Sequence, residues 1–97
     1  MNAGPSRQST REEALFKEAC HLIKRKYGLT DREVEVLCLL SRHGYTNGQM
    51  ARQLFISEVT VKSHIASLFK KMGAKSTRKL QAIVLAELVH FFRQSSL

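Results

Sequence analysis

Apolar residues recur at helical spacing from about residue 10 to residue 93. The alternation typical of β-strands never lasts for more than a few positions. Capping residues and glycines divide this stretch into predicted helices over residues 11–26, 31–42, 47–54, 58–72 and 76–92. The chain is therefore expected to fold as one small all-α domain.

N-cap hydroxyls mark three of these helix starts. Thr30 with Glu33 and Thr46 with Gln49 have the spacing of capping boxes, in which each side chain accepts a hydrogen bond from the other residue's backbone N–H. Ser57 has the position of a single N-cap before the fourth helix. Because all three starts coincide with the onset of an apolar stripe, the pattern places helix boundaries as well as helices.

Residues 46–72 have the pattern of a helix-turn-helix. Ala51 is small where the second helix must cross the first, and apolar residues around it wedge the two helices together. At about 100° per residue, the outer face of the second helix is polar or small, which suits a major groove about 12 Å wide. That face carries Val59, Ser63, Ala66, Ser67 and Lys70, with Lys62, Thr60 and Lys71 on its flanks. The alternative interpretation is an ordinary amphipathic helix with a solvated lysine face.

The positive charge is concentrated in the same part of the chain. Sixteen Lys and Arg against eight Asp and Glu give a net charge of +8 on 97 residues. Residues 46–80 hold seven of the basic and one of the acidic side chains, a net charge of +6. A concentrated basic segment favours a polyanionic partner such as nucleic acid, although a generally basic protein would show the same total.

Length and composition exclude several classes of protein. Ninety-seven residues are too few for a multidomain enzyme or a doubly wound nucleotide-binding fold. The sequence has no apolar run long enough to span a membrane, and its start lacks the pattern of a signal peptide. A cytoplasmic protein without a membrane partner is the expectation.

Cysteines and histidines indicate no catalytic or metal site. Cys20 and Cys38 lie far apart in the sequence with no C-x-x-C spacing, so each is interpreted as a reduced, small apolar residue on a helix. The four histidines form neither a zinc motif nor a triad. No metal, cofactor or enzymatic activity is predicted.

Residues 29–86 resemble the LuxR/GerE-type DNA-binding domain of bacterial transcription regulators. The resemblance rests on several pieces in the family's order and spacing: Leu29-Thr30, Arg32-Glu33, Glu35-Val36-Leu37, Ala51, Ile56-Ser57-Glu58, Thr60-Val61-Lys62 and His64. It implies a four-helix domain over residues 29–93. The apolar pattern places an extra N-terminal helix over residues 10–28 before this domain, and the polar composition of residues 1–9 predicts a disordered tail. The third helix of such a domain, residues 57–72 here, enters the major groove of promoter DNA.

The resemblance also implies particular contacts. Base contacts are implied for Lys62, Ser63 and Ala66, and the helical face adds Val59 and Ser67. Phosphate contacts are implied for Thr46, Thr60, Lys70 and Lys71, with Asn47 and Ser57 assisting at helix N-termini. The family tends to dimerise through its last helix, which has an apolar excess here; the candidate dimer contacts are Leu80, Val84, Leu88 and Phe91.

Two features depart from the family pattern. Many relatives carry a basic residue at the position of Gly48 and Glu at that of Gln49, which weakens the case for DNA-backbone contacts from the helix over 47–54. Only a short segment, 1–28, precedes the domain, so a stand-alone regulator and a fragment of a longer one both remain open. The helix over 10–28 either packs on the domain or serves as a dimerisation arm or protein-docking site.

Two other functions fit the same sequence. One is a promoter-reading domain like the fourth region of a sigma factor, which has a similar helix-turn-helix. The other is a protein-binding module that titrates another regulator through the N-terminal or last helix. The favoured prediction is a sequence-specific, homodimeric, bacterial transcription regulator that is associated with the nucleoid when bound to DNA.

Overall fold

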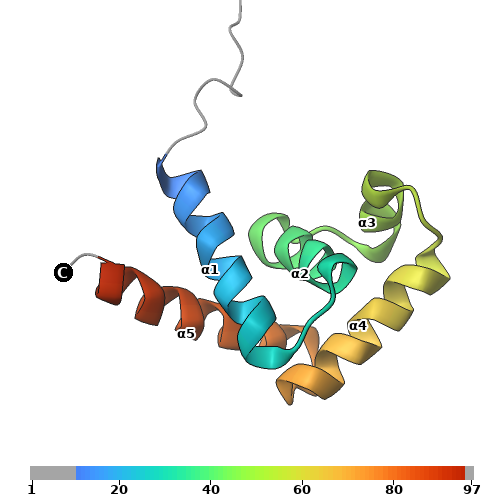
Figure 1. Cartoon of the computed structure of the whole chain (residues 1–97). Coiled ribbons are helices and arrows are strands. Elements are labelled where there is room, and N and C mark those ends of the chain that lie inside the picture. The colour runs from blue at the N-terminus through green and yellow to red at the C-terminus, as the bar shows by residue number, and fades with distance from the viewer. Residues whose placement is uncertain (1–10, 96–97) are drawn as a thin grey trace, which may run out of the picture.

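A computed structural model describes residues 11–95 of the chain. This range contains five helices and no strand (Figure 1), which confirms the prediction of an all-α fold. The helix boundaries agree with the predicted ones to within three residues, and the largest difference is at the end of the last helix. The predicted disordered tail, residues 1–9, lies outside the described residues. The helices are α1 (Arg11–Tyr27), α2 (Asp31–His43), α3 (Asn47–Leu54), α4 (Glu58–Met72) and α5 (Thr77–Ser95).

Both predicted capping boxes are present. At the start of α2, the Glu33 N–H donates to Thr30 Oγ1 at 3.1 Å, and the Thr30 N–H donates to Glu33 Oε1 at 2.9 Å. Thr46 and Gln49 make the equivalent pair at the start of α3, at 3.2 and 2.8 Å. These bonds satisfy N–H groups that have no partner within the helix, which fixes where α2 and α3 begin.

Left-handed residues end α2, α3 and α4. Gly44 and Gly73 follow α2 and α4 with φ values of 65° and 67°. The residue that ends α3 is Phe55, which has a φ of 58° although it carries a side chain. This conformation costs a residue with a Cβ atom about 1–2 kcal/mol relative to the right-handed region. The turn between α3 and α4 is therefore strained at Phe55.

The core lies between α2, α3, α4 and α5. Helix α4 packs against both α2 and α3, and α5 closes the core from the other side. Each of these four helices contributes at least one side chain with no appreciable exposure: Val36, Met50, Val61, Leu68 and Leu80. Burial of each such side chain stabilises the fold by about 1.5–3 kcal/mol.

Helix α1 packs on α5 and α2, as one of its two expected roles requires. Its Ala19 and Ile23 are buried. Glu87 of α5 accepts hydrogen bonds from Lys26 Nζ at 2.6 Å and from the Tyr27 hydroxyl at 2.7 Å. These two bonds lower the pKa of Glu87, so this carboxylate anchors the end of α1 to α5.

The five helices form two sides of the molecule. Helices α3 and α4 lie on one side, α1 and α5 lie on the other, and α2 runs between them (Figure 1). The molecule measures 37 × 35 × 20 Å along its principal axes. The helix-turn-helix therefore occupies an outer side of the domain, where a large ligand can reach it.

Candidate nucleic-acid interface

The turn between α3 and α4 sets the angle of the helix-turn-helix. The N–H groups of Phe55 and Ile56 donate to the carbonyls of Arg52 at 3.4 Å and Ala51 at 3.0 Å, which closes α3. Ala51 is 6% exposed, and its small side chain sits within the core cluster that includes Val61. The predicted wedge of apolar residues around Ala51 is thus present.

The N-terminus of α4 is capped by Ser57, as predicted. Its hydroxyl oxygen accepts a hydrogen bond from the Thr60 N–H at 3.1 Å and lies 2.9 Å from Thr60 Oγ1. Ser57 is exposed and Thr60 is half-buried. The positive end of the α4 dipole and two hydroxyls therefore gather at one point of the surface, which is an arrangement that suits an anion.

Helix α4 buries one face and exposes the other. Val61, Leu68 and Met72 lie in the core. The opposite face is exposed along its whole length, and Val59 at its start is 75% exposed. The exposed face contains Val59, Lys62, Ser63, Ala66 and Lys70. These are short side chains and flexible lysines, so a rigid groove can approach the helix closely.

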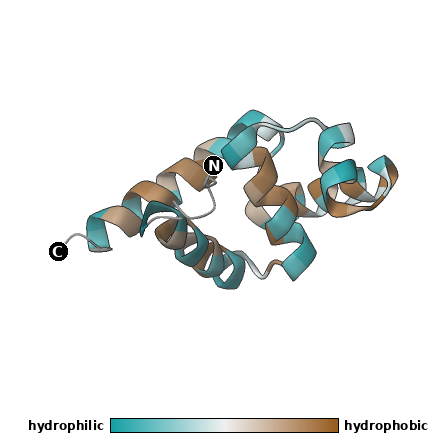
Figure 2. Cartoon of the chain, turned by 90° about the horizontal axis from the view of Figure 1, so that it is seen from above, coloured by the Kyte–Doolittle hydropathy of each residue, from teal (hydrophilic) through white to brown (hydrophobic). Residues whose placement is uncertain are grey.

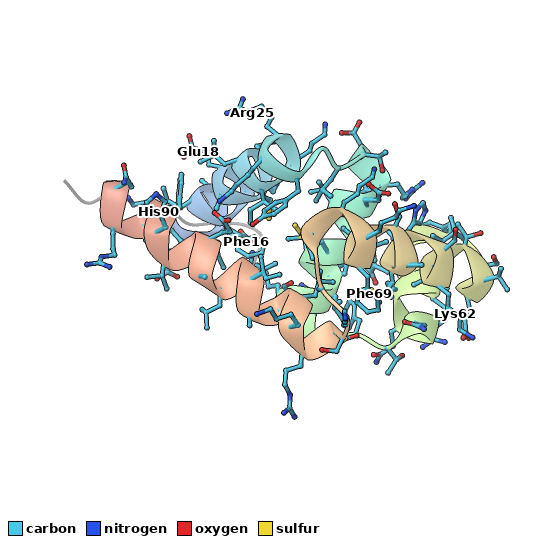
Figure 3. All side chains as sticks on the ribbon, turned by 90° about the horizontal axis from the view of Figure 1, so that it is seen from below. Phe16, Glu18, Arg25, Lys62, Phe69 and His90 are labelled. Atoms are coloured by element: carbon cyan, nitrogen blue, oxygen red, sulfur yellow. The ribbon has the colours of Figure 1, made fainter. Side chains whose placement is uncertain are left out.

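Figure 3 shows Lys62 on this outer side of the molecule, far from Glu18 of α1 and His90 of α5. The lysine is exposed, and its ammonium group sits at the end of a flexible stem. An ammonium group at this position can reach guanine acceptors or phosphate oxygens.

A buried carboxylate fixes the position of α4 relative to α2. Glu33 is 4% exposed, and its oxygens accept hydrogen bonds from Ser67 Oγ at 2.5 Å and Lys71 Nζ at 2.8 Å. Burial alone raises the pKa of Glu33, but the hydrogen bonds from Lys71, Ser67 and the Thr30 backbone outweigh it and hold the pKa at about 2. The ionised carboxylate thus holds α4 against α2.

The Glu33 contacts involve two of the residues that are predicted to touch DNA. Helical phasing assigns Ser67 to the outer face, but the residue is half-buried and its hydroxyl donates to Glu33. Lys71 is expected on phosphate; its ammonium group is paired with the same carboxylate while the residue is exposed, so the phosphate contact stays a prediction. Both residues contact Glu33 of α2, and the Ser67 hydroxyl is thereby directed away from the groove-facing side of α4.

Two further candidate phosphate ligands, Thr46 and Asn47, lie at the start of α3. Thr46 is exposed and Asn47 is half-buried. The Thr46 hydroxyl oxygen accepts the Gln49 N–H, and its own hydrogen is available to donate to an anion. Together with Ser57 and Thr60, these residues bring two helix N-termini to the same side of the molecule.

Helix α3 also exposes polar residues that helical phasing and the family resemblance do not select. Arg52 and Gln53 are exposed and, with Tyr45 and Gln49, line a surface depression of about 250 Å³. The local charge is the available signal, because Arg52 belongs to the basic segment 46–80.

The predicted dimer contacts need a larger correction. Leu80 and Val84 are 0% and 3% exposed, because both lie in the core of the domain. They are therefore inaccessible to a second chain without unfolding. Leu88 and Phe91 are half-buried.

The exposed large apolar residues of α5 are Leu85, Val89 and Phe92, at 62%, 47% and 38% exposure. Their spacing of four and three positions puts them on a single stripe of the helix. Apolar residues run along much of α5 in Figure 2. An exposed apolar surface therefore exists on α5, but it lies on a different face of the helix from the predicted contacts Leu80 and Val84.

Residues 11–95 meet neither the requirements of a metal site nor those of a membrane-spanning helix. No group of three or more potential metal ligands is found among residues 11–95. No helix in this range is both long enough and apolar enough to cross a lipid bilayer.

Comparison with known proteins gives one family and several relatives. Residues 27–90 match GerE, described as "Bacterial regulatory proteins, luxR family". The CsgBAC operon transcriptional regulatory protein of Escherichia coli is 54% identical over 48 residues, which cover 50% of this chain and 22% of the relative. The DNA-binding transcriptional activator DevR/DosR of Mycobacterium tuberculosis is 46% identical over 59 residues, which cover 61% of this chain and 26% of the relative.

A third relative matches over more of the chain. The nitrate/nitrite response regulator protein homolog of Haemophilus influenzae is 45% identical over 81 residues, which cover 84% of this chain and 35% of the relative. The chain thus spans between about a fifth and a third of the length of these relatives. No solved structure matches it.

Proposed function

Because the chain belongs to the luxR family of bacterial regulatory proteins, we propose that it regulates transcription in the bacterial cytoplasm by placing α4 in the major groove of promoter DNA. The family is one of regulators and not of enzymes. The observation that carries the proposal is the outer face of α4, which is exposed along its length, small in profile and basic, while its inner face is fixed in the core. The helix can therefore enter a groove as a rigid body.

Base reading is assigned to the middle of this face. Lys62 donates to guanine O6 or N7, and Ser63 donates to or accepts from a neighbouring base edge. Ala66 and Val59 offer only apolar contact, which suits a thymine methyl group. With Ser67 turned toward Glu33, four side chains remain to read sequence.

Backbone contacts surround the base-reading face. Lys70, the hydroxyls of Thr46, Ser57 and Thr60, and the amide of Asn47 supply the phosphate ligands, and Arg52 adds a cation from α3. The N-termini of α3 and α4 contribute their partial positive charge. These contacts position α4 and provide most of the non-specific affinity.

We assign the homodimer contact to the stripe of Leu85, Val89 and Phe92 on α5. Three adjacent apolar side chains on an exposed helix face are an unfavourable surface in water, and a second copy of the same stripe would bury them around a twofold axis. A dimer would present two copies of α4 to two half-sites. The same stripe would serve a heterologous protein partner, which is the alternative that the oligomeric state tests.

The direct experiment is selection of bound duplexes from a random library, followed by affinity measurement on the selected site across a range of salt. We expect a defined sequence with two half-sites, and a steep fall of log K with log [salt] because several phosphate contacts release counterions. Failure to enrich a sequence, or a flat salt dependence, would contradict the proposal. A stable complex with another protein and no DNA binding at physiological salt would favour the titrating module instead.

A further inference from the structure

Cys20 of α1 and Cys38 of α2 face each other where these two helices pack. Their Sγ atoms are 2.7 Å apart, and the thiols share a hydrogen bond. They are the two cysteines of the chain, and both are free. The two residues are distant in the sequence, and it is the packing of α1 on α2 that brings them together.

The thiols border a surface cavity of about 280 Å³ between α1 and α2. Cys20 is buried and Cys38 is half-buried, so a small reagent in the cavity meets Cys38 more readily. Arg42 also lines the cavity, and its guanidinium lies 5.2 Å from the centre of the Phe16 ring and 3.8 Å from a Glu13 oxygen. The site therefore combines a thiol pair, an entrance and a nearby cation.

The two thiols are not equivalent. The hydrogen bond with Cys20 lowers the pKa of Cys38 despite its burial, and the charge of Arg42 acts in the same direction against that of Glu35. The same hydrogen bond, together with burial, raises the pKa of Cys20. Cys38 is thus both the more accessible of the two thiols and the one whose pKa is lowered, so we assign it as the attacking thiol and Cys20 as the resolving one.

We propose that Cys20 and Cys38 are a site of reversible oxidation, at which a hydroperoxide converts the thiol pair into a disulfide that joins α1 to α2. The sulfur atoms must approach from 2.7 Å to about 2.05 Å, so the helices need only a small adjustment. The N-terminal helix lies almost entirely outside the family match at residues 27–90. Oxidation of the pair would thus attach α1 covalently to the domain, at a site that does not include the outer face of α4.

The chemistry proceeds in two balanced steps. The Cys38 thiolate attacks the terminal oxygen of the hydroperoxide; an S–O bond forms, the O–O bond breaks, and the alkoxide leaves and takes up a proton as an alcohol. Cys20 then loses its proton and attacks the Cys38 sulfur; the S–S bond forms, and the sulfenic oxygen leaves as water. In total, two thiols are oxidised and one hydroperoxide is reduced to alcohol and water.

The test uses the full, reduced chain and one equivalent of tert-butyl hydroperoxide, with intact-mass and peptide analysis. We expect a monomer that has lost two hydrogens, with Cys20 joined to Cys38, and full reversal by dithiothreitol. The cross-link should form at least about tenfold faster than in the chain unfolded by guanidinium, because packing holds the thiols together. Unreacted thiols, intermolecular dimers, or equal rates in the folded and unfolded chains would each overturn the proposal.

Single substitutions test the assignment of roles. In Cys20→Ser, dimedone should trap a sulfenic acid on Cys38, because the resolving thiol is missing. In Cys38→Ser, the buried Cys20 should react at least about tenfold more slowly. Equal or reversed reactivity would overturn the assignment. Oxidised wild-type chain should also show a Tm at least about 5 °C higher than the reduced chain, and neither single variant should show this rise.

Discussion

Helices α4 and α5 each bury one face in the core, but the exposed face of α4 is basic and that of α5 is apolar. Each is several turns long and buries one face in the same core. The outer face of α4 presents lysines with small side chains between them, whereas the outer face of α5 presents the apolar stripe of Leu85, Val89 and Phe92. Both inner faces are buried in one core, so the two helices differ in what their outer faces offer to a partner.

One small domain therefore offers two kinds of contact. A face with short side chains and mobile cations suits a polyanion that carries a rigid groove. A face with contiguous apolar side chains suits a protein surface that removes them from water. We propose that α4 meets DNA and α5 meets protein, and substitutions on and behind the two faces test this division.

The largest expected effect comes from the carboxylate behind α4. Glu33→Gln should lower the free energy of unfolding at pH 7 by about 3 kcal/mol, because it removes the charge that Lys71 and Ser67 contact. Glu35→Gln is the matched control on the same helix. It loses only an exposed pair with Arg32 at 3.0 Å and should cost less than about 1 kcal/mol. Equal losses in urea denaturation would remove Glu33 from this role.

The pH dependence of the same residue has a definite sign. Because the folded-state pKa of Glu33 is about 2, below its ordinary value of 4.5, the folded chain binds this proton more weakly than the unfolded chain. The ionised carboxylate therefore stabilises the fold fully above pH 4.5, and this contribution is lost as the pH falls toward 2. The wild-type chain and Glu33→Gln should converge in stability over this window. A constant difference across the whole window would contradict the assignment.

The next largest effect concerns the apolar stripe. The double substitution Leu85→Ser and Val89→Ser should weaken self-association by about 2–3 kcal/mol, measured by sedimentation equilibrium, while leaving the monomer folded because both side chains are exposed. Val59→Ser removes a comparable apolar group from α4 and should leave self-association unchanged. Loss of association in Val59→Ser instead would reverse the comparison.

Lys62→Ala should weaken binding to the selected DNA site by about 1–3 kcal/mol and reduce discrimination against random duplex. Arg25→Ala removes the same unit of charge from α1, on the side of the molecule away from Lys62 (Figure 3), and should change the affinity much less. Fluorescence anisotropy at fixed salt measures both. An equal effect of the two substitutions would mean that only net charge matters.

The smallest effect is at a glycine within α3. Gly48→Ala should stabilise the domain by about 0.5–1 kcal/mol, because alanine favours a helix interior. A Cβ atom there meets Glu58 Oε2 at 3.2 Å, and this exposed carboxylate end can move aside. Thermal unfolding measures the gain. A lower Tm would show that the close approach of α3 to the start of α4 requires glycine.

Much of the fold follows from local sequence. The capping boxes at Thr30 and Thr46 and the cap at Ser57 predict the starts of α2, α3 and α4 correctly. These signals act within one turn of a helix, so they can be recognised without knowledge of the tertiary structure.

The errors arise where the tertiary arrangement decides. Ser67 and Lys71 have polar side chains on the edge of the outer face, and their contacts with Glu33 depend on how α4 packs against α2. Helix α5 is apolar on most of its circumference, so its phase cannot be obtained from periodicity alone. This explains why the pattern selects Leu80 and Val84 in place of the exposed stripe. Contact between Cys20 and Cys38 likewise depends on how α1 packs.

The most direct test of this division between α4 and α5 is titration of the ¹⁵N-labelled chain with the selected DNA site, followed by backbone amide shifts. We expect the largest perturbations on the outer face of α4 and at the starts of α3 and α4, with the Lys62 and Ser63 amides shifting most. The amides of Leu85, Val89 and Phe92 should not shift with DNA at fixed oligomeric state. Perturbations centred on α5, with α4 unaffected, would contradict the account.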